Sequence, residues 1–147
     1  FLDDAYSTIA RQFHFVLFEK EAHELIKKGG SREDLEELYF KLLRGHFGDS
    51  VEVNEIFKYE YLYIPHIYHT PFYCYAYGFG LLLAMSLYAR YLKNDSFKDE
   101  IKKILSAGSN DSPRNILKKS GIELNEEFWQ SGFNYLRDLV EKVKQIK

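Results

Sequence analysis

Apolar side chains recur every three or four residues from Leu2 to Val16, and further apolar residues follow up to Ile26, so the sequence predicts one long helix over residues 1–28. The stripe is formed by Leu2, Tyr6, Ile9, Phe13 and Val16, followed by Ala22, Leu25 and Ile26. Phe15 and Phe18 widen it, so we expect this helix to be covered on more than one side. Gly29 and Gly30 then end the helix, because glycine readily adopts the left-handed conformation that closes one.

A second helix is predicted from Ser31 onward, because Ser31 stands three residues before Asp34, the spacing of a capping box. The helix ends at Gly45 or Gly48. Its apolar face consists of Leu35, Leu38, Tyr39, Leu42 and Leu43. In residues 55–64, aromatic side chains stand at every second position, an alternation that favours a strand. Because no partner strand is evident in the sequence, we predict a short helix or an extended segment there.

Two prolines divide the next stretch. Pro65 and Pro71 bracket a connector that we predict to be irregular and that carries His66 and His69. Pro71 also suits the first position of a helix, where its missing N–H has no intrahelical partner to lose. We therefore predict a long apolar helix from Pro71 to about Lys93.

Capped helices fill the remainder. Ser96 is predicted to cap residues 97–107, with Asp99 completing a second capping box and Gly108 ending the helix.

Ser112 and Pro113 begin a short helix that ends at Gly121, and Asn125 caps the last helix. The apolar stripe of that last helix is Phe128, Trp129, Phe133, Leu136, Val140 and Val143. Since no convincing strand pair appears anywhere, the sequence predicts an all-α fold, a single-domain helical bundle over residues 1–147.

Composition narrows the class of protein. The net charge is −2, from 20 basic and 22 acidic side chains, so nucleic acid is not an expected partner. The single cysteine excludes an internal disulfide and any metal cluster of several cysteines, and it suits a reducing compartment. Asp3 and Asp4 stand where a secretory signal would be cationic, so we expect a cytoplasmic protein. Because residue 1 is Phe, we expect the chain to be processed or part of something longer.

No charged side chain occurs between Glu60 and Arg90, a run long enough to raise the question of a membrane span. Tyrosines, histidines and prolines dilute the run before Gly78, and the flanking segments are amphipathic. We therefore expect a helix buried inside a soluble protein and no membrane partner. A membrane-embedded protein built on residues 71–89 is the alternative.

Tyrosine is concentrated in the same region. Seven of the twelve tyrosines lie between Tyr59 and Tyr77, together with His66 and His69. A buried tyrosine needs a partner for its hydroxyl, so the stretch indicates a surface where hydroxyls and imidazoles converge on something polar. The alternative is a core helix whose tyrosines reach solvent with their tips.

The histidines by themselves predict no metal site. His66 and His69 are three residues apart, whereas zinc proteases place two histidines four apart around a glutamate that is missing here. The flanking prolines also argue against a regular helix across the pair. His14 and His23 fit helix-surface or packing positions, and His46 fits a cation at a helix C-terminus.

Tyr73 and Tyr77 stand one turn apart near the start of the predicted long helix. Unpaired N–H groups at a helix start favour negative charge. With a histidine close by, the two hydroxyls could donate hydrogen bonds to a developing oxyanion. Gly78 and Gly80 follow, and close approach of the backbone to a substrate or to another helix would explain them.

Several segments together resemble one enzyme family. Residues 64–68, Ile-Pro-His-Ile-Tyr, and residues 71–77, Pro-Phe-Tyr-Cys-Tyr-Ala-Tyr, resemble the IPHFY…FYVYQY signature of the oligoendopeptidase F branch of the thimet-oligopeptidase-like zinc peptidases. Residues 8–19 resemble the TxFRQxxFAxFE helix of those enzymes, and residues 106–122 resemble their LxAGxSxxP…GVD segment. The resemblance covers nearly the whole chain in the right order, with Ala76 in place of the signature's Gln.

The resemblance implies the C-terminal part of a larger, mostly helical metallopeptidase. The family holds zinc with two histidines of HExxH and a glutamate downstream, all N-terminal to the region matched here, so we expect no metal ligand, no tight zinc binding and no activity in the isolated chain. Family members use a histidine and a tyrosine of this segment to bind the substrate backbone and stabilise the oxyanion, and these fall on His66 and Tyr73. The further candidates for substrate binding are Tyr68, His69, Tyr75 and Tyr77.

Two functions follow as alternatives. The first is the substrate-binding, oxyanion-stabilising wall of a cytoplasmic zinc oligopeptidase, whose partners are short peptides and the N-terminal half of the same enzyme. The second is a stand-alone helical binding module with an aromatic groove for a peptide or apolar ligand, without catalysis. Because the missing half would cover part of this chain, we also expect exposed apolar area and homodimers of the isolated chain.

Overall fold

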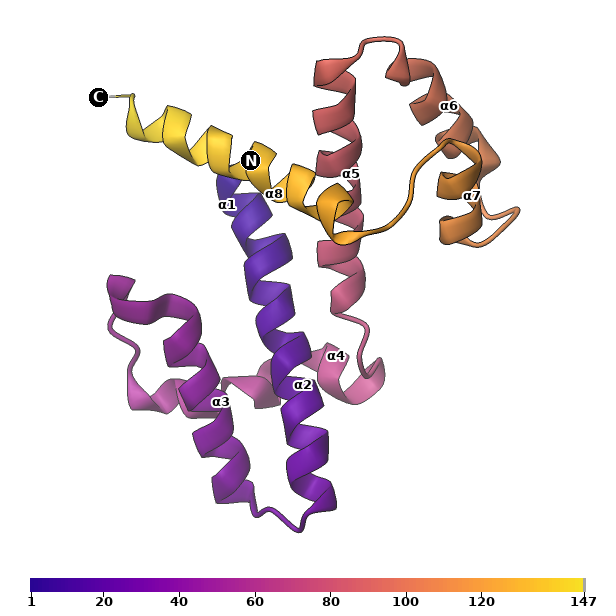
Figure 1. Cartoon of the computed structure of the whole chain (residues 1–147). Coiled ribbons are helices and arrows are strands. Elements are labelled where there is room, and N and C mark those ends of the chain that lie inside the picture. The colour runs from indigo at the N-terminus through magenta and orange to yellow at the C-terminus, as the bar shows by residue number, and fades with distance from the viewer. Residues whose placement is uncertain (147) are drawn as a thin grey trace. The chain divides into compact units, whose positions relative to one another are not determined.

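The computed structural model describes residues 1–146, and every regular element among them is a helix (Figure 1). This confirms the predicted all-α fold. The chain divides into two compact units, one made of Phe1 and Asp3–Phe79, the other of Leu2 and the residues from Gly80 onward. The assignment of the whole chain to a single domain stays a prediction.

The first unit begins with helical turns that follow one another without a break. They are α1 (Leu2–Ala5), the π-helical segment η1 (Tyr6–Arg11) and α2 (Gln12–Lys27). The predicted long helix is therefore present. Its π-helical segment was not predicted, because a local change from i→i+4 to i→i+5 hydrogen bonds hardly alters the spacing of apolar residues.

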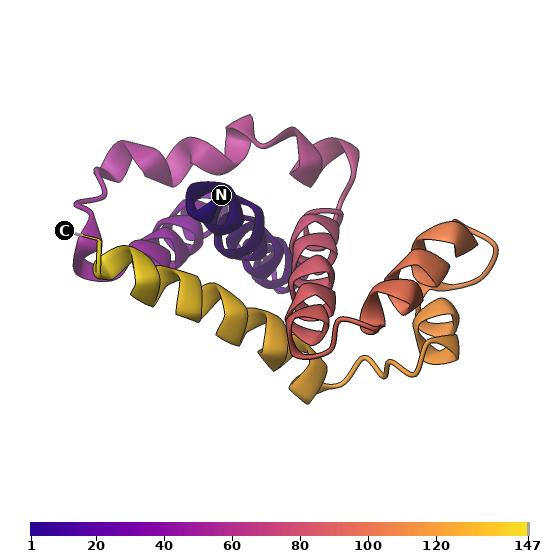
Figure 2. The same ribbon diagram turned by 90° about the horizontal axis from the view of Figure 1, so that it is seen from above.

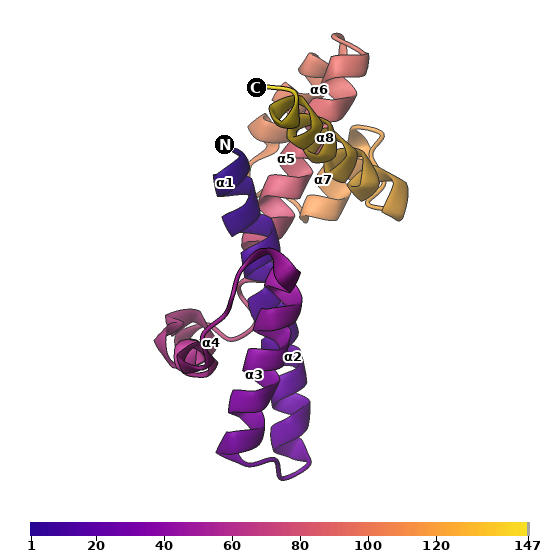
Figure 3. The same cartoon turned by 90° about the vertical axis from the view of Figure 1, so that its left-hand side faces the viewer.

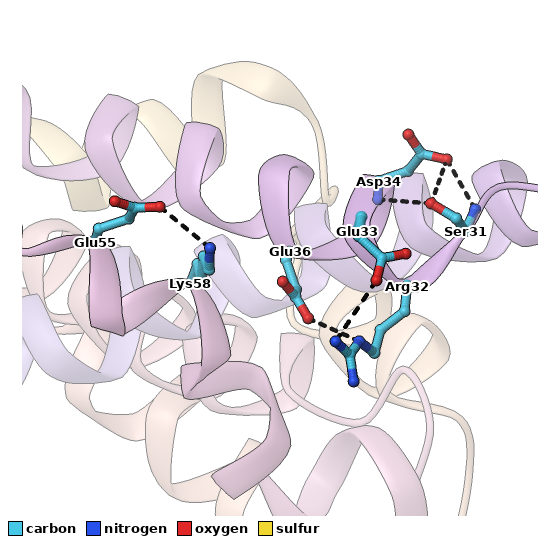
Figure 4. A network of polar contacts seen from close by, with 7 residues as sticks. All are labelled: Ser31, Arg32, Glu33, Asp34, Glu36, Glu55 and Lys58. Carbon is cyan, nitrogen blue, oxygen red and sulfur yellow. Dashed lines mark hydrogen bonds and ion pairs between the residues drawn. The ribbon is translucent and has the colours of Figure 1, made fainter.

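α3 (Arg32–Phe47) lies beside α2 and runs in the opposite direction (Figures 1 and 3). Ser31 opens α3 with the predicted capping box (Figure 4). Its hydroxyl oxygen accepts from the N–H of Asp34 at 3.1 Å, and its own N–H donates to Asp34 Oδ2 at 2.8 Å. In the first turn, Arg32 Nε lies 3.0 Å from a carboxylate oxygen of the buried Glu36 (Figure 4).

The stretch that could have been a strand is helical. After the short turn η2 (Gly48–Ser50), the 3₁₀ helix η3 (Glu55–Tyr63) packs against α3; Figure 2 shows it in magenta. Asn54 caps η3 by accepting the N–H of Ile56 at 3.0 Å. The core of this unit consists of Phe18, Ala22, Tyr39, Leu43 and Tyr61. Helical winding brings one tyrosine of the alternating run into this core. A strand without a partner would leave its buried backbone N–H and C=O groups unpaired, which costs free energy.

The stretch with the candidate residues departs from the prediction in two places. Residues Pro65–His69 form a short helix, α4, where the prolines predict an irregular connector. Pro65 takes the first helical position, so its missing N–H leaves no hydrogen bond unmade. α5 (Tyr75–Lys93) begins after Pro71 and not at it, because Phe72 has a φ of 60°, which is incompatible with a right-handed helix.

The second unit contains most of α5 and the remaining helices. These are α6 (Phe97–Ala107), α7 (Pro113–Lys119) and α8 (Glu126–Lys144). Ser112 and Asn125 cap α7 and α8 as predicted, accepting backbone N–H groups at 3.3 and 2.9 Å. Ser96 does not cap α6, because its backbone is already helical and its hydroxyl donates to Asn94 Oδ1 at 2.8 Å. The second predicted capping box is therefore wrong.

The core of the second unit is small and closely packed. Its buried members are Leu87, Leu117, Ile122 and Phe128. α8 approaches α5 at Gly132, where a Cβ atom would lie 2.6 Å from Ser86 Oγ and 3.1 Å from the carbonyl oxygen of Leu82. Only glycine permits this approach of the two helices, because a carbonyl oxygen cannot move aside as a side chain can.

A membrane-spanning helix is absent from the part of the chain that the structure describes, since none of its helices combines the necessary length and apolarity. This includes α5, which contains most of residues 71–89, the run considered above for a membrane-embedded protein.

Candidate functional site

His66, Tyr73 and Tyr77 lie together in the first unit. His66 Nε2 and the hydroxyl of Tyr77 form a hydrogen bond of 2.9 Å. The rings of His66 and Tyr73 are parallel within 7°, with centroids 6.3 Å apart, and the rings of Tyr73 and Tyr77 are perpendicular at 5.6 Å. The structure thus brings both predicted catalytic residues and one predicted substrate-binding residue into one cluster, called the His66 cluster below.

The His66 cluster is accessible. Tyr73 is 49% exposed and Tyr77 is 39% exposed. The hydroxyl of Tyr73 makes no hydrogen bond with any of residues 1–146, whereas that of Tyr77 is engaged by His66. Tyr73 therefore carries a donor that is free for a ligand.

The turn before α5 places Tyr73 outside the helix, contrary to the prediction. Its N–H donates to the carbonyl oxygen of Thr70 at 3.1 Å, and its carbonyl oxygen accepts from the N–H of Ala76 at 2.9 Å. Tyr77 belongs to the first turn of α5. The rings of the two tyrosines meet although only Tyr77 belongs to α5, since Tyr73 lies in the turn that leads into this helix.

The other predicted substrate-binding residues lie outside this cluster. Tyr75 is 54% exposed, and no contact of its ring with His66 or Tyr73 occurs among the described residues. Tyr68 and His69 are exposed on α4, and partial burial raises the pKa of Tyr68. Their role in binding stays a prediction.

A second polar group, half-buried in the first unit, was not predicted. The guanidinium of Arg11 pairs with the carboxylate of Glu60, and the hydroxyl of Tyr39 donates to Glu60 Oε2 at 2.8 Å. Burial alone would raise the pKa of Glu60, but the hydrogen bonds from Arg11 and Tyr39 outweigh it, and the pKa is lowered. Burial and the Glu60 carboxylate raise the pKa of Tyr39. The sequence held one sign of this polar group: Arg11 is a charged residue next to the wide apolar stripe of the first helix.

His46 is not the helix-terminal cation that its position predicts. Burial first, and then the charge of Arg11, lower the pKa of His46, which favours the neutral imidazole. Its Nε2 shares a hydrogen bond of 2.7 Å with the hydroxyl of Tyr6. His14 is buried and packs against Tyr39, so it holds a packing position, whereas His23 is exposed on α2.

The described residues offer no metal site. Residues 1–146 contain no group of three or more His, Cys, Asp or Glu side chains placed to hold an ion. His66 is engaged by Tyr77, and the thiol of Cys74 is buried with a pKa raised by burial and by Glu19. The described residues therefore do not fit the zinc that the resemblance implies.

A groove of about 700 Å³ lies in the second unit, between the C-terminal part of α5 and α8. Its lining includes Arg90, Glu123 and Tyr135, with no histidine or cysteine from the described part of the chain. The His66 cluster is the better candidate site, because it brings together both predicted catalytic residues, whereas none of the predicted site residues lines this groove.

Known proteins resemble this chain along nearly its whole length. Residues 2–134 match the model of peptidase family M3. An oligoendopeptidase F homolog from Borreliella burgdorferi is 35% identical over 150 residues, covering 99% of this chain and 25% of that protein. The chromosomal oligoendopeptidase F of Lactococcus lactis subsp. cremoris is 31% identical over 153 residues, covering 96% of this chain and 25% of that protein.

The fold has a solved counterpart. A candidate peptidase from Chlamydophila abortus, known from its crystal structure, matches with a TM-score of 0.85 and 29% sequence identity. The match covers 96% of this chain and 24% of that one. The chain thus spans about a quarter of the length of the proteins it resembles.

Proposed function

Because the chain belongs to peptidase family M3, as its resemblance to the oligoendopeptidase F branch predicts, we propose that it forms the substrate-binding and oxyanion-stabilising wall of a zinc-dependent oligopeptidase. The reaction is hydrolysis of a peptide bond in a short peptide. Family membership favours this function over a stand-alone binding module. The isolated chain is inactive, because it lacks the metal-binding half.

The observation that carries the proposal is the arrangement of the His66 cluster. Tyr73 has an exposed, unengaged hydroxyl beside the imidazole of His66. A tetrahedral intermediate of peptide hydrolysis concentrates negative charge on the former carbonyl oxygen. A phenol held by ring stacking presents its donor without reorganisation at the moment that charge develops, which is what lowers the barrier.

Tyr77 supports this arrangement by holding His66. The tautomer of His66 decides which group donates in their 2.9 Å hydrogen bond. If the Tyr77 hydroxyl donates to Nε2, the N–H on the other ring nitrogen of His66 is left for the substrate. If Nε2–H donates to the Tyr77 oxygen, the hydroxyl hydrogen of Tyr77 is left for the substrate. Either way His66 or Tyr77 supplies the second polar contact to the peptide. Tyr68, His69 and Tyr75 provide further binding surface.

Zinc belongs to the part of the enzyme outside this chain. When bound there, it would polarise the scissile carbonyl and activate water. The partners of this chain are accordingly short peptides and the N-terminal half of the same enzyme, in the cytoplasm. What the present residues contribute is a pair of hydrogen-bond donors on the opposite side of the substrate.

The test is steady-state kinetics of Tyr→Phe variants in the full-length protein, with the zinc content checked. Tyr73→Phe removes only a hydroxyl that interacts mainly with the transition state, so kcat should fall by about 10²–10³ while KM changes little. Tyr75→Phe is the matched control, two residues away and outside the His66 cluster, and should keep its kcat. Tyr77→Phe should give an intermediate loss, because it acts through His66.

Two results would contradict the assignment. A normal kcat for Tyr73→Phe with a loss for Tyr75→Phe would mean that the wrong tyrosine was chosen. A normal kcat for all three variants would mean that the aromatic stretch serves packing alone.

A further inference from the structure

The residue before Tyr73 has an unusual backbone conformation. Phe72 has a φ of 60°, and no other non-glycine residue of the described chain has a positive φ. For a bulky L-residue this conformation is strained, because Cβ approaches the following carbonyl oxygen. Strain of this kind persists only where surrounding contacts hold it, so the contacts of Phe72 show what fixes the turn.

Two residues of α2 hold Phe72. Glu19 Oε1 accepts the N–H of Phe72 at 2.8 Å, which joins residues 53 apart in the sequence. His23, one helical turn after Glu19, packs its ring against the Phe72 ring with centroids 4.8 Å apart. One face of α2 therefore contacts both the backbone and the side chain of Phe72.

The buried position of the Glu19 carboxyl group destabilises the fold. Glu19 is 1% exposed, and its second oxygen, Oε2, has no hydrogen-bond partner among residues 1–146. A buried carboxyl group that is only half satisfied is unfavourable compared with an apolar side chain of similar size. Packing alone therefore does not account for a glutamate at this position, whereas its bond to the Phe72 N–H does.

The conformation of Phe72 determines where Tyr73 points. The turn is closed by the bond from Tyr73 N–H to the Thr70 carbonyl, and α4 ends directly before it at His69. A change of φ at Phe72 would rotate everything that follows relative to α4, which carries His66. The parallel stacking of Tyr73 on His66 therefore depends on the turn that Glu19 holds.

We propose that Glu19 is a positioning residue of the catalytic site: its carboxylate clamps the N–H of Phe72 and so aims the Tyr73 hydroxyl beside His66. This inference rests on the proposed function of Tyr73. Glu19 does not touch the substrate, and its effect is on the orientation of the donor. A displacement of about 1 Å at a reacting group can cost on the order of 10²-fold in rate.

The experiment compares two nearly isosteric variants in the full-length protein. Glu19→Gln keeps an oxygen that can accept from Phe72 N–H, and Glu19→Met fills the same space without an acceptor. Glu19→Met should lower kcat by about 10–100-fold with little change in KM, and Glu19→Gln should restore most of the loss. Glu36→Met is the matched control, because Glu36 is also buried in the first unit but pairs with Arg32, away from the turn.

A second measurement does not depend on activity. Hydrogen exchange of the segment 70–74 reports whether the Phe72 N–H is still bonded. Exchange should become faster in Glu19→Met and stay slow in Glu19→Gln, Glu36→Met and Tyr73→Phe. Thermal unfolding of each variant shows that the protein is folded under the assay conditions.

The outcomes separate this inference from the proposed function. A folded Glu19→Met variant with normal kcat, in a protein where Tyr73→Phe is impaired, overturns the positioning role and leaves the function of Tyr73 intact. A normal kcat for Tyr73→Phe overturns both. If Glu19→Met does not fold, Glu19→Gln decides: slow exchange with near-normal kcat supports the clamp, and a loss of either overturns it.

Discussion

His14 lies in the first unit close to Arg11 and His46. It is 4% exposed and packs edge-on against Tyr39 with ring centroids 5.2 Å apart. Burial, followed by the charges of Arg11 and His46, lowers the pKa of His14 from 6.5 to about 4, and the Glu60 carboxylate only partly opposes this. The folded state therefore favours the neutral imidazole, which loses less hydration free energy on burial than the charged form does.

This residue makes the stability of the chain depend on pH. The pKa of His14 is lower in the folded state, so the unfolded state binds the proton more tightly. The contribution of His14 is fully present above pH 6.5 and is lost as the pH falls toward 4, by up to about 1.4 kcal/mol per pH unit. Urea unfolding between pH 7 and pH 4 measures this loss.

The variant His14→Phe should flatten the pH dependence in that window, whereas His23→Gln, an exposed position on the same helix, should leave it as it is. An identical slope in wild type and His14→Phe would show that other groups cause the loss.

At the scale of elements, helices differ in whether a side chain accepts the free backbone N–H groups at their start. Ser31→Ala removes an acceptor for the Asp34 N–H and should lower the free energy of unfolding by about 1 kcal/mol. Ser96→Ala should cost less than about 0.5 kcal/mol, because its hydroxyl binds Asn94 and not the end of α6. Denaturant titration with helical circular dichroism as the signal measures both.

Ser112→Ala provides the comparison within the second unit, because Ser112 accepts the N–H of Asn115 at 3.3 Å. Its loss should exceed that of Ser96→Ala. Equal losses at Ser96 and Ser112 would contradict the assignment of the caps.

At the scale of the whole chain, large apolar side chains remain in contact with solvent in both units. More than half of the surface of each of these side chains is exposed: Ile26, Ile56, Leu62 and Tyr63 in the first unit, and Leu92, Leu105 and Val143 in the second. We expect the isolated chain to self-associate, since exposed apolar area of this kind favours contact between copies. Sedimentation over a range of concentrations measures the association, and a strict monomer at the highest concentration would contradict it.

The amino-acid sequence by itself determined the features that depend on neighbouring residues. Apolar spacing is a property of a single helix, so it predicted α3, α6, α7 and α8 close to their observed ends. Caps at Ser31, Ser112 and Asn125 involve residues three apart and were predicted for the same reason. The motif resemblance needs only the order of residues, and the family match confirms the resemblance. The roles that it implies for His66 and Tyr73 stay predictions.

Tertiary structure alone decided what depends on residues far apart. Burial cannot be read from a local pattern, and it lowers the pKa of His46, whose position at the helix end predicts a cation. Arg11 pairs with Glu60, 49 residues away in the sequence, and Glu19 accepts the N–H of Phe72, 53 residues away. Local propensity disfavours a positive φ at Phe72, and the turn nevertheless adopts it where Glu19 of a distant helix accepts the Phe72 N–H. The orientation of the candidate catalytic tyrosine is therefore a property of the folded chain.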